Sequence, residues 1–311
     1  MSDKTESYPL VSVVVVTYNS AQYVRQTLDS VLSQTYKGPI ELIVSDDGSK
    51  DETVANCERW MDEHSSSLHN CAVIQTPHNL GICGNYNFAL GHIAGEWVKY
   101  IAGDDLLTHE CIETYINAAL KSDDKFFISG VLTFYNGQDS FTPRYLMGEL
   151  LDSSDASVQA QNLAKFAGGG IVEGPTFFIN TKSFREMGGM NTYYPMLEDF
   201  PFAFRWAFSG RHIGVIKKPL VKYRIYPESI SQSKEMFKVM YHDAMYDARM
   251  KIAKRQHNYF EWWHNRVMKR LSGYESIKDD KGFPHYMWKL SDIYAHSKRI
   301  QNIFKLNVYK R

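Results

Sequence analysis

Apolar runs that end in polar residues recur along the first hundred residues. The first run, residues 10–17, is almost entirely β-branched, which is typical of a strand buried on both faces of a parallel sheet. Three similar runs predict further strands at residues 40–45, 71–75 and 97–101. Apolar residues at helical spacing predict the intervening helices at 20–34, 51–64 and 84–94. This alternation predicts an α/β fold with right-handed crossovers and a doubly wound, mainly parallel sheet of the Rossmann-like kind.

The second part of the chain has a looser pattern. Its apolar spacing predicts helices at 109–121 and 199–209, and strands at 126–134, 175–179 and 214–226. Residues 136–160 are polar and are expected to form an excursion, and Gly168, Gly169 and Gly170 a hinge or a close backbone approach. At the start of the first helix, Ser20 is the expected N-cap. From residue 233 onward the spacing is helical, with interruptions at residues 273 and 282–284.

Charge divides the chain at about the same place. Residues 234–311 hold 17 basic and 8 acidic residues, whereas the rest holds 18 basic and 27 acidic residues. The total is balanced at a formal net charge of +0. This asymmetry predicts that the two parts face different partners and that the basic tail, residues 233–311, meets an anionic surface.

Composition limits the class of protein. The chain has 311 residues and 44% hydrophobic residues, which is ordinary for a globular protein. Its N-terminus has no apolar signal core, and the apolar run 10–16 is too short to span a bilayer. The four cysteines have no metal-site spacing and are expected to be reduced thiols. The expected location is the cytoplasm, with peripheral contact at the inner face of the membrane as an option for the basic helices.

Polar clusters follow the first, second and fourth predicted strands. They are Thr17-Tyr18-Asn19, Asp46-Asp47 and Asp104-Asp105. In open α/β sheets ligands bind outside the carboxyl ends of the strands, so these clusters are expected to share one crevice. Two acidic pairs in one crevice repel each other unless a cation or hydrogen-bond donors compensate. A divalent cation, Mn²⁺ or Mg²⁺, held by carboxylates and substrate phosphates would do so.

Two other interpretations of these acids stay open. Asp46 or Asp47 could accept hydrogen bonds from a base or a ribose. Alternatively, Asp-Asp-Gly-Ser at residues 46–49 could be only a turn before a helix, since these residue types are common in turns. No Walker loop and no G-x-G-x-x-G follows the first strand, which argues against NTPases and dinucleotide enzymes. A nucleotidyltransferase would usually have a Gly-rich, basic loop there, and residues 17–20 have neither feature.

In their order and spacing these motifs resemble the inverting family 2 glycosyltransferases of the GT-A fold. The resemblance covers roughly residues 8–232. The matching elements, beyond the three clusters above, are Gly48-Ser49, Asn79-Leu80-Gly81, Asn87, Gly95-Glu96-Trp97, Glu198-Asp199, Tyr223-Arg224 and Ser229-Ile230-Ser231. It implies a GT-A domain over residues 1–232, with a nucleotide-binding half at 8–106 and an acceptor-binding half at 107–232. Residues 233–311 would be a basic helical extension.

The resemblance also implies roles for individual residues. The nucleotide-binding set would be Thr17, Tyr18, Asn19, Asp46, Asp47, Asn79, Gly81, Asn87 and Asp104. Asp104 and Asp105 would hold the metal and the diphosphate, and Asp199, with Glu198 beside it, would deprotonate the acceptor hydroxyl. The implied partners are a nucleotide-sugar donor and a glycan or lipid-linked acceptor of a bacterial surface polysaccharide. No nucleic acid partner is expected.

The chain departs from the family pattern at three positions. Ala102 stands where the D-x-D motif often begins with Asp, Tyr86 where an Arg is common, and Tyr226 where a His is common. These departures keep open a non-catalytic nucleotide-binding or scaffold protein on a decayed transferase fold. The Q-x-x-R-W motif of processive synthases is absent around Phe204-Arg205-Trp206, which predicts the addition of a single sugar.

Two further features have a structural alternative. Glu198-Asp199 could be no more than a favourable negative charge at the N-terminus of a helix. Trp262-Trp263, which lie near basic residues, could contact a membrane interface or a lipid-linked acceptor. They could equally pack a helical cap on the main domain.

Overall fold

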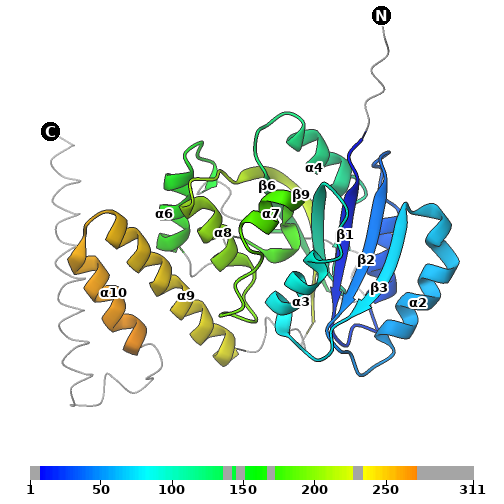
Figure 1. Ribbon diagram of the computed structural model, residues 1–311, viewed down its shortest axis with the longest axis horizontal. Helices are drawn as coiled ribbons and strands as arrows, with labels where there is room; N and C mark the ends of the chain where they lie inside the picture. Colours follow the sequence, from blue (N-terminus) through cyan, green and yellow to red (C-terminus); the bar gives the residue numbers. More distant parts are fainter. Residues whose placement is uncertain (1–7, 136–141, 145–150, 167–171, 227–233, 272–311) are drawn as a thin grey trace, which may run out of the picture. The chain divides into compact units, whose positions relative to one another are not determined.

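The computed structural model describes residues 8–135, 142–144, 151–166, 172–226 and 234–271 (Figure 1). The chain divides into two compact units, residues 1–233 and 234–311. The first unit begins with an alternation of strands and helices: β1 (Val11–Thr17), α1 (Val24–Leu32), β2 (Ile40–Asp46), α2 (Thr53–His64), β3 (Asn70–Gln75), α3 (Gly81–Leu90) and β4 (Trp97–Ala102). A single turn of 3₁₀ helix (Ser65–Ser67) extends α2. The predicted strand and helix positions of this segment are confirmed to within a few residues.

The rest of the first unit has shorter elements. They are β5 (Leu106–Leu107), α4 (Cys111–Ala119), β6 (Phe126–Tyr135), β7 (Thr142–Arg144), α6 (Ala156–Phe166), the 3₁₀ turn η2 (Gly174–Thr176), β8 (Phe178–Asn180), α7 (Thr181–Glu186), α8 (Asp199–Phe208) and β9 (Gly214–Ile225). In the second unit the structure describes two helices, α9 (Lys234–Arg255) and α10 (Tyr259–Leu271).

The strands of the described residues form one nine-stranded sheet in the order β3-β2-β1-β4-β8-β6-β9-β5, with β7 paired to β6. The pairs β1–β2, β1–β4, β2–β3 and β6–β9 are parallel. Antiparallel β8 joins the two parallel parts, since it pairs with both β4 and β6. The register aligns Thr17 with Asp46 at the carboxyl ends of β1 and β2, and Val16 with Ala102 of β4. Three of the predicted polar clusters therefore follow neighbouring strands at one edge of the sheet.

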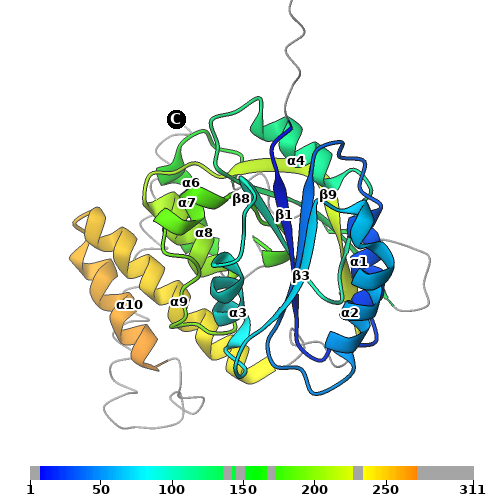
Figure 2. The same ribbon diagram turned by 45° about the vertical axis from the view of Figure 1, so that its right-hand side comes forward.

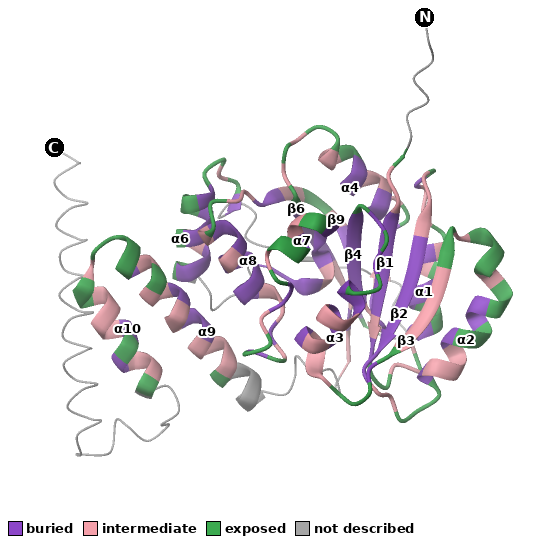
Figure 3. Cartoon of the chain, viewed as in Figure 1, coloured by how far each residue is buried: buried purple, intermediate pink, exposed green. Residues whose placement is uncertain are grey.

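Both faces of the central strands are buried, as their near-continuous apolar sequences predict. Figure 3 shows β1, β2 and β4 buried over most of their length. Val11, Val13 and Val15 of β1 pack in one core with residues of α1, α2 and α4. Beyond the other face, an aromatic cluster links the sheet to α7 and α8 through Phe184, which contacts Tyr100 and Phe202. Figure 2 shows α1 and α2 on one side of the strands and α3, α7 and α8 on the other. The α/β fold class with a doubly wound sheet is thus confirmed.

Several local expectations differ from the structure or lie outside its described residues. Ser20 is not the N-cap of the first helix, because α1 begins at Val24 and its N-cap, Tyr23, makes no side-chain capping bond. The polar segment 136–160 includes β7 and the start of α6. The strand expected at 175–179 is a 3₁₀ turn followed by the three residues of β8. The glycines 168–170 and the helix interruptions at 273 and 282–284 lie outside the described residues.

None of the helices in the described part of the chain is long and apolar enough to cross a membrane.

Candidate active site

The carboxylate of Asp46 is fully engaged at the carboxyl end of β2. Its Oδ2 accepts a hydrogen bond of 2.9 Å from the hydroxyl of Thr17, which is buried, and another from the hydroxyl of Ser49. Its Oδ1 accepts from the backbone N–H of Gly48, at 3.1 Å, and of Ser49, at 2.8 Å. A carboxylate has about four acceptor positions, and four donors fill them here. Asp46 therefore fixes the turn at residues 46–49, as the turn interpretation of this motif expects.

Asn19 joins the end of β1 to the same turn. Its backbone N–H donates to the Ser49 hydroxyl at 2.7 Å, and its side-chain Oδ1 accepts from the N–H of Lys50 at 2.8 Å. Its φ of 52° lies in the left-handed region, which Asn tolerates better than most residues. The preceding residue, Tyr18, is exposed, with 46% of its surface accessible. Its ring is thus available for stacking on a ligand at this edge of the sheet.

Asp47 reaches from the end of β2 to the start of α3. Its Oδ1 accepts from the hydroxyl of Thr76 at 2.9 Å and from the N–H of Leu80 at 2.8 Å. Its Oδ2 accepts from the N–H of Gly81 at 2.9 Å, and the same N–H also donates to Oδ1 of Asn79 at 3.1 Å. Gly81 has a φ of +75°, a conformation that glycine adopts without strain. Asp47 therefore gathers the predicted residues Asn79 and Gly81, and its Oδ2 has one acceptor position left beyond these bonds.

Asn87 takes no part in this cluster. Its side-chain amide donates to the carbonyl of Met190 at 3.0 Å and its Oδ1 accepts from the N–H of the same residue at 2.6 Å. This pair of bonds holds α3 to the loop before α8. The structure brings together the other residues predicted to follow β1, β2 and β3, and the nucleotide-binding role of Asn87 stays a prediction.

The acids that follow β4 are held by the end of β9. Oδ2 of Asp104 accepts from the hydroxyl of Tyr226 at 2.7 Å, and Oδ1 of Asp105 accepts from the N–H of Arg224 at 2.9 Å. Oδ2 of Asp105 is buried and has no hydrogen-bond partner among the described residues. Burial raises the pKa of both carboxyls, and for Asp105 the neighbouring charge of Asp104 adds to the effect.

Arg224 is a site residue whose role is not predictable from the sequence motifs alone. Its Nε donates to the carbonyl of Asp104 at 2.7 Å. Its guanidinium lies between the rings of Tyr23 and Phe134, 4.4 and 4.5 Å from their centroids. Because 120 positions separate Arg224 from Asp104, only the fold reveals this contact. The Tyr223-Arg224 segment, noted as a family feature, was the one available signal.

A second acidic pair stands at the start of α8. Oδ1 of Asp199 accepts from the N–H of Phe200 at 2.6 Å, which is the contact that a negative charge at a helix N-terminus makes. Burial nevertheless raises the pKa of Asp199 to about 6. Burial, together with the charge of Asp199, raises the pKa of Glu198 to about 8. Desolvation therefore raises these pKa values by more than the helix N-terminus lowers them. Near neutral pH the pair holds one proton, which resides mainly on Glu198.

The turn at residues 173–176 lies close to both acidic pairs. The charge of Glu173 helps to raise the pKa of Asp105, so Glu173 lies within electrostatic range of the β4 end. A Cβ added to Gly174 would overlap Oε1 of Glu198. Lys99 of β4 holds the turn in place, because its buried ammonium donates to the carbonyl of Pro175. Burial lowers the pKa of Lys99 to about 8. In the sequence, the one indication of this role is that Lys99 interrupts the otherwise apolar run of β4.

No three His, Cys, Asp or Glu side chains in the described parts of the chain are grouped so as to hold a metal ion. Mg²⁺ in proteins is commonly held by one or two carboxylates together with substrate phosphates and water. Asp104 and Asp105 supply such carboxylates, and the unpartnered Oδ2 of Asp105 fits a role as an oxygen ligand.

Comparison with known proteins identifies the family and the fold of the chain. The family model described as glycosyl transferase family 2 matches residues 12–188. An uncharacterized glycosyltransferase of Rickettsia bellii is 29% identical over 233 residues, or 72% of this chain and 31% of that protein. One of Haemophilus influenzae is 34% identical over 118 residues, or 38% of this chain and 35% of that protein. The matches thus span about a third of the length of these curated relatives.

Solved structures with the same fold include S. aureus TarS. The structure of its residues 1–349 with UDP has a TM-score of 0.60 and 19% identity, and the match covers 88% of this chain and 75% of that one. The structure of the same fragment with UDP-GlcNAc also has a TM-score of 0.60, with 18% identity over 90% of this chain and 79% of that one. At this level of identity the similarity shows the fold alone. Since the family model spans more than half of the sequence, the chain belongs to glycosyl transferase family 2.

Proposed function

We propose that the protein transfers one sugar from a nucleotide-diphosphate sugar, with UDP as the nucleotide, to a hydroxyl of a glycan or lipid-linked acceptor. One observation carries the proposal. The turn 173–176 lies close to both acidic pairs, since Glu173 is within electrostatic range of Asp105 and Gly174 lies against the carboxylate of Glu198. A donor diphosphate at the acids after β4 and an acceptor hydroxyl at the acidic pair of α8 would meet near this turn. Family membership and the UDP and UDP-GlcNAc complexes of TarS support the choice of donor.

On the donor side, the chain offers distinct contacts for the base and the diphosphate. The exposed ring of Tyr18 would stack on the base, and the remaining acceptor position of Asp47 would take an N–H of its edge. Asp104 and Asp105 would hold a divalent cation, Mn²⁺ or Mg²⁺, which supplies charge stabilisation to the departing diphosphate. The backbone bond from Arg224 to Asp105 and the Tyr226 hydroxyl on Asp104 would orient these carboxylates.

On the acceptor side, Asp199 would act as the general base. With a pKa raised to about 6, it is ionised at neutral pH and yet basic enough to take a proton from a hydroxyl as attack begins. The acceptor oxygen would then form a bond to the anomeric carbon as the bond to the diphosphate breaks on the opposite face. A single displacement of this kind inverts the anomeric centre. Glu198, protonated near neutral pH, would leave Asp199 as the one anionic member of the pair.

The wider role follows as part of the same proposal. Non-processive addition of single sugars in the synthesis of a bacterial surface polysaccharide fits the absence of the processive motif. An acceptor carried on a lipid would place the protein at the inner face of the membrane, in contact through its basic C-terminal helices.

The test is a screen of nucleotide sugars with the full chain in the presence of Mn²⁺. A true donor should raise the melting temperature by mass action and should be hydrolysed slowly or transferred to an added acceptor. Proton NMR of the first product then gives the anomeric configuration, and its chain length gives the processivity. If no nucleotide sugar is bound or turned over, the proposal fails. Binding of UDP without any turnover would instead favour the decayed, non-catalytic alternative.

A further inference from the structure

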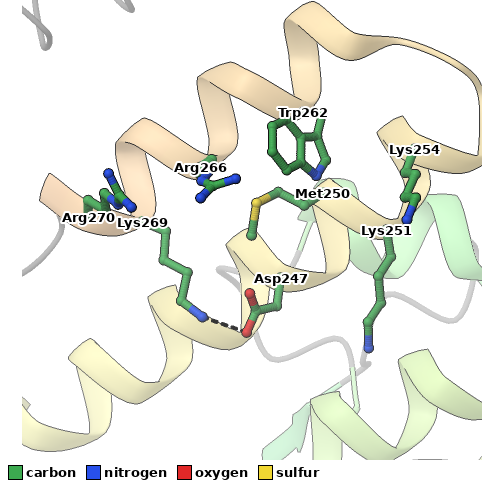
Figure 4. Close-up of a pocket in the computed structure, with 8 residues that line it drawn as sticks. All are labelled: Asp247, Met250, Lys251, Lys254, Trp262, Arg266, Lys269 and Arg270. Carbon is green, nitrogen blue, oxygen red and sulfur yellow. Dashed lines mark hydrogen bonds and ion pairs between the residues drawn. The ribbon is translucent and has the colours of Figure 1, made fainter.

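The second unit contains a basic groove between its two described helices. The groove has a volume of about 550 Å³ and is shown in Figure 4. Five of its lining residues are cations: Lys251, Lys254, Arg266, Lys269 and Arg270. Lys251 and Lys254 are three positions apart on α9, and on α10 Arg266 precedes Lys269 by three positions and Arg270 by four, so each helix presents its cations toward one side. The groove therefore concentrates positive charge from α9 and α10 in one place.

One carboxylate lines the groove, and it is already engaged. Asp247 bonds to the ammonium of Lys269 at 2.6 Å, as Figure 4 shows. Lys251, Lys254, Arg266 and Arg270 are exposed. Four like charges around a small groove repel one another, and a ligand with several negative oxygens would relieve that repulsion. Charge complementarity thus points to a phosphate-bearing ligand.

An aromatic side chain sets the position of one of these cations. The guanidinium of Arg266 lies 5.0 Å from the ring centroid of Trp262, which forms part of the groove wall. Contact with the indole limits the orientations of the guanidinium, and its N–H groups can still donate hydrogen bonds to a ligand. A planar guanidinium held in this way suits bidentate bonds to phosphate oxygens.

Exposed aromatic residues on α10, the helix that lines one wall of the groove, favour a membrane over a soluble polyanion. At the start of α10, Tyr259 is 67% exposed and Phe260 is 69% exposed. Tyr259 precedes Arg266 by seven positions, which places the two residues on the same side of the helix. Aromatic residues next to a cluster of Lys and Arg are typical of helices that lie at the interface of an anionic bilayer. Binding of a soluble polyanion would leave these apolar rings exposed to water.

We propose that the groove between α9 and α10 binds the phosphate headgroups of anionic phospholipids and docks the protein on an anionic bilayer, with Tyr259 and Phe260 entering the interface. This inference rests on the membrane contact included in the proposed function, and it identifies the residues and the lipid chemistry of that contact. It does not depend on glycosyl transfer, because vesicle binding is measured in the absence of any sugar donor.

The experiment is co-sedimentation of the full chain with phosphatidylcholine vesicles that do or do not contain phosphatidylglycerol. The groove variant carries Lys251→Gln and Lys254→Gln. The matched control carries Lys121→Gln and Lys182→Gln, which remove two exposed lysines from the first unit and so change the net charge equally. We expect binding to phosphatidylglycerol vesicles only, weakened at least about ten-fold in the groove variant and less than about two-fold in the control. Melting curves of all variants check that they are folded.

The proposal is overturned if the wild type binds both kinds of vesicle equally or neither kind, or if the groove variant and the control lose the same affinity. Release of bound protein by millimolar inorganic phosphate at constant ionic strength would also overturn it, since the groove would then be a site for free phosphate. A further variant, Tyr259→Ser with Phe260→Ser, should bind more weakly without changing the preference for phosphatidylglycerol. Transfer to a soluble acceptor, measured separately, would be unchanged in every variant, so the two proposals fail independently.

Discussion

At the scale of single residues, two neighbouring aspartates at the end of β2 have different capacities for a ligand. Four donors of the protein fill the acceptor positions of Asp46. Three donors bond to Asp47, which leaves its Oδ2 able to accept one more hydrogen bond. The sequence presents both as equivalent members of one motif, and their separate roles depend on which backbone N–H groups the fold places around them.

Replacement of these two aspartates should therefore have different effects on nucleotide binding. Asp46→Asn removes acceptors of buried donors and should destabilise the fold by roughly 1–3 kcal/mol while leaving the affinity of the folded protein for UDP within about three-fold. Asp47→Asn should weaken UDP binding at least about ten-fold, because the bond to the base is lost. Calorimetric titration with UDP, together with melting curves, measures both effects. Equal loss of affinity in the two variants would contradict this assignment.

The acidic pair of α8 gives a prediction for the pH dependence of transfer. Asp199 must be ionised to act as a base, so activity should rise with pH through about 6. Asp199→Asn should lower kcat by about 10²- to 10⁴-fold and leave nucleotide affinity nearly intact. In Glu198→Gln the rise near pH 6 should stay in place, because Glu198 is already neutral at that pH. A pH–rate profile of each variant measures this, and full turnover in Asp199→Asn would remove this residue as the base.

At the scale of elements, the turn η2 positions the two halves of the site relative to each other. It lies close to both Asp105 and Glu198, and two buried side chains, one from the sheet and one from α4, hold it in place. The ammonium of Lys99 bonds to the carbonyl of Pro175, and the hydroxyl of Tyr115 bonds to the carbonyl of Thr176. These bonds hold an irregular segment in place against the sheet and α4. Accurate placement of such a turn is what a two-substrate reaction requires.

Gly174 tests this role of the turn. A Cβ at this position would overlap the carboxylate of Glu198, so Gly174→Ala should displace either the turn or the acidic pair. We expect transfer to fall at least about ten-fold with UDP affinity unchanged, because a small displacement of catalytic groups is costly. Gly91→Ala is the matched control, since its Cβ would meet only the carbonyl of Phe88 at 3.4 Å. Transfer and UDP binding are assayed for both variants. Equal transfer activity in the two would refute the role of η2 in positioning the site.

The elements differ in how well the sequence predicts them. The strands β1, β2 and β4 are buried on both faces, and their runs of Val, Ile and Leu are a strong signal. The helix α6 buries mainly small residues, such as Ala156 and Ala160, so its apolar periodicity is weak. The strand β8 has three residues and exists because β4 and β6 flank it on either side. Pairing across the sheet, which no local pattern contains, decides such an element.

At the scale of the whole molecule, the acidic pair of α8 couples stability to pH. A carboxyl whose pKa is higher in the folded state contributes stability below its unfolded value, near 4.5 for Glu198, and loses it as pH rises through the folded value of about 8. A glutamine at this position cannot ionise. We therefore expect Glu198→Gln to melt at a higher temperature than the wild type at pH 9 and at the same temperature at pH 4.

Calorimetric melting curves at the two pH values measure this difference. Glu58→Gln is the matched control, because Glu58 is exposed and the same substitution there removes a charge that remains in water. The difference in melting temperature between Glu58→Gln and the wild type should be the same at pH 4 and pH 9. If Glu198→Gln behaves like this control, the carboxyl of Glu198 does not carry a raised pKa in the folded protein.

The sequence by itself determined the alternating α/β architecture of the first unit and the basic helical character of the second. Both are encoded locally, in the period of apolar residues and in the distribution of charge. It also determined that polar residues follow the ends of β1, β2 and β4. The tertiary structure decided how those residues are used: which aspartate is saturated, which carboxyl oxygen is left without a partner, and that Arg224 and Tyr226 hold the acids after β4. The bond from Thr17 to Asp46 joins residues 29 positions apart, and the bond from Tyr226 to Asp104 joins residues 122 positions apart. Hydrogen bonding, burial and pKa are properties of such contacts rather than of residue types.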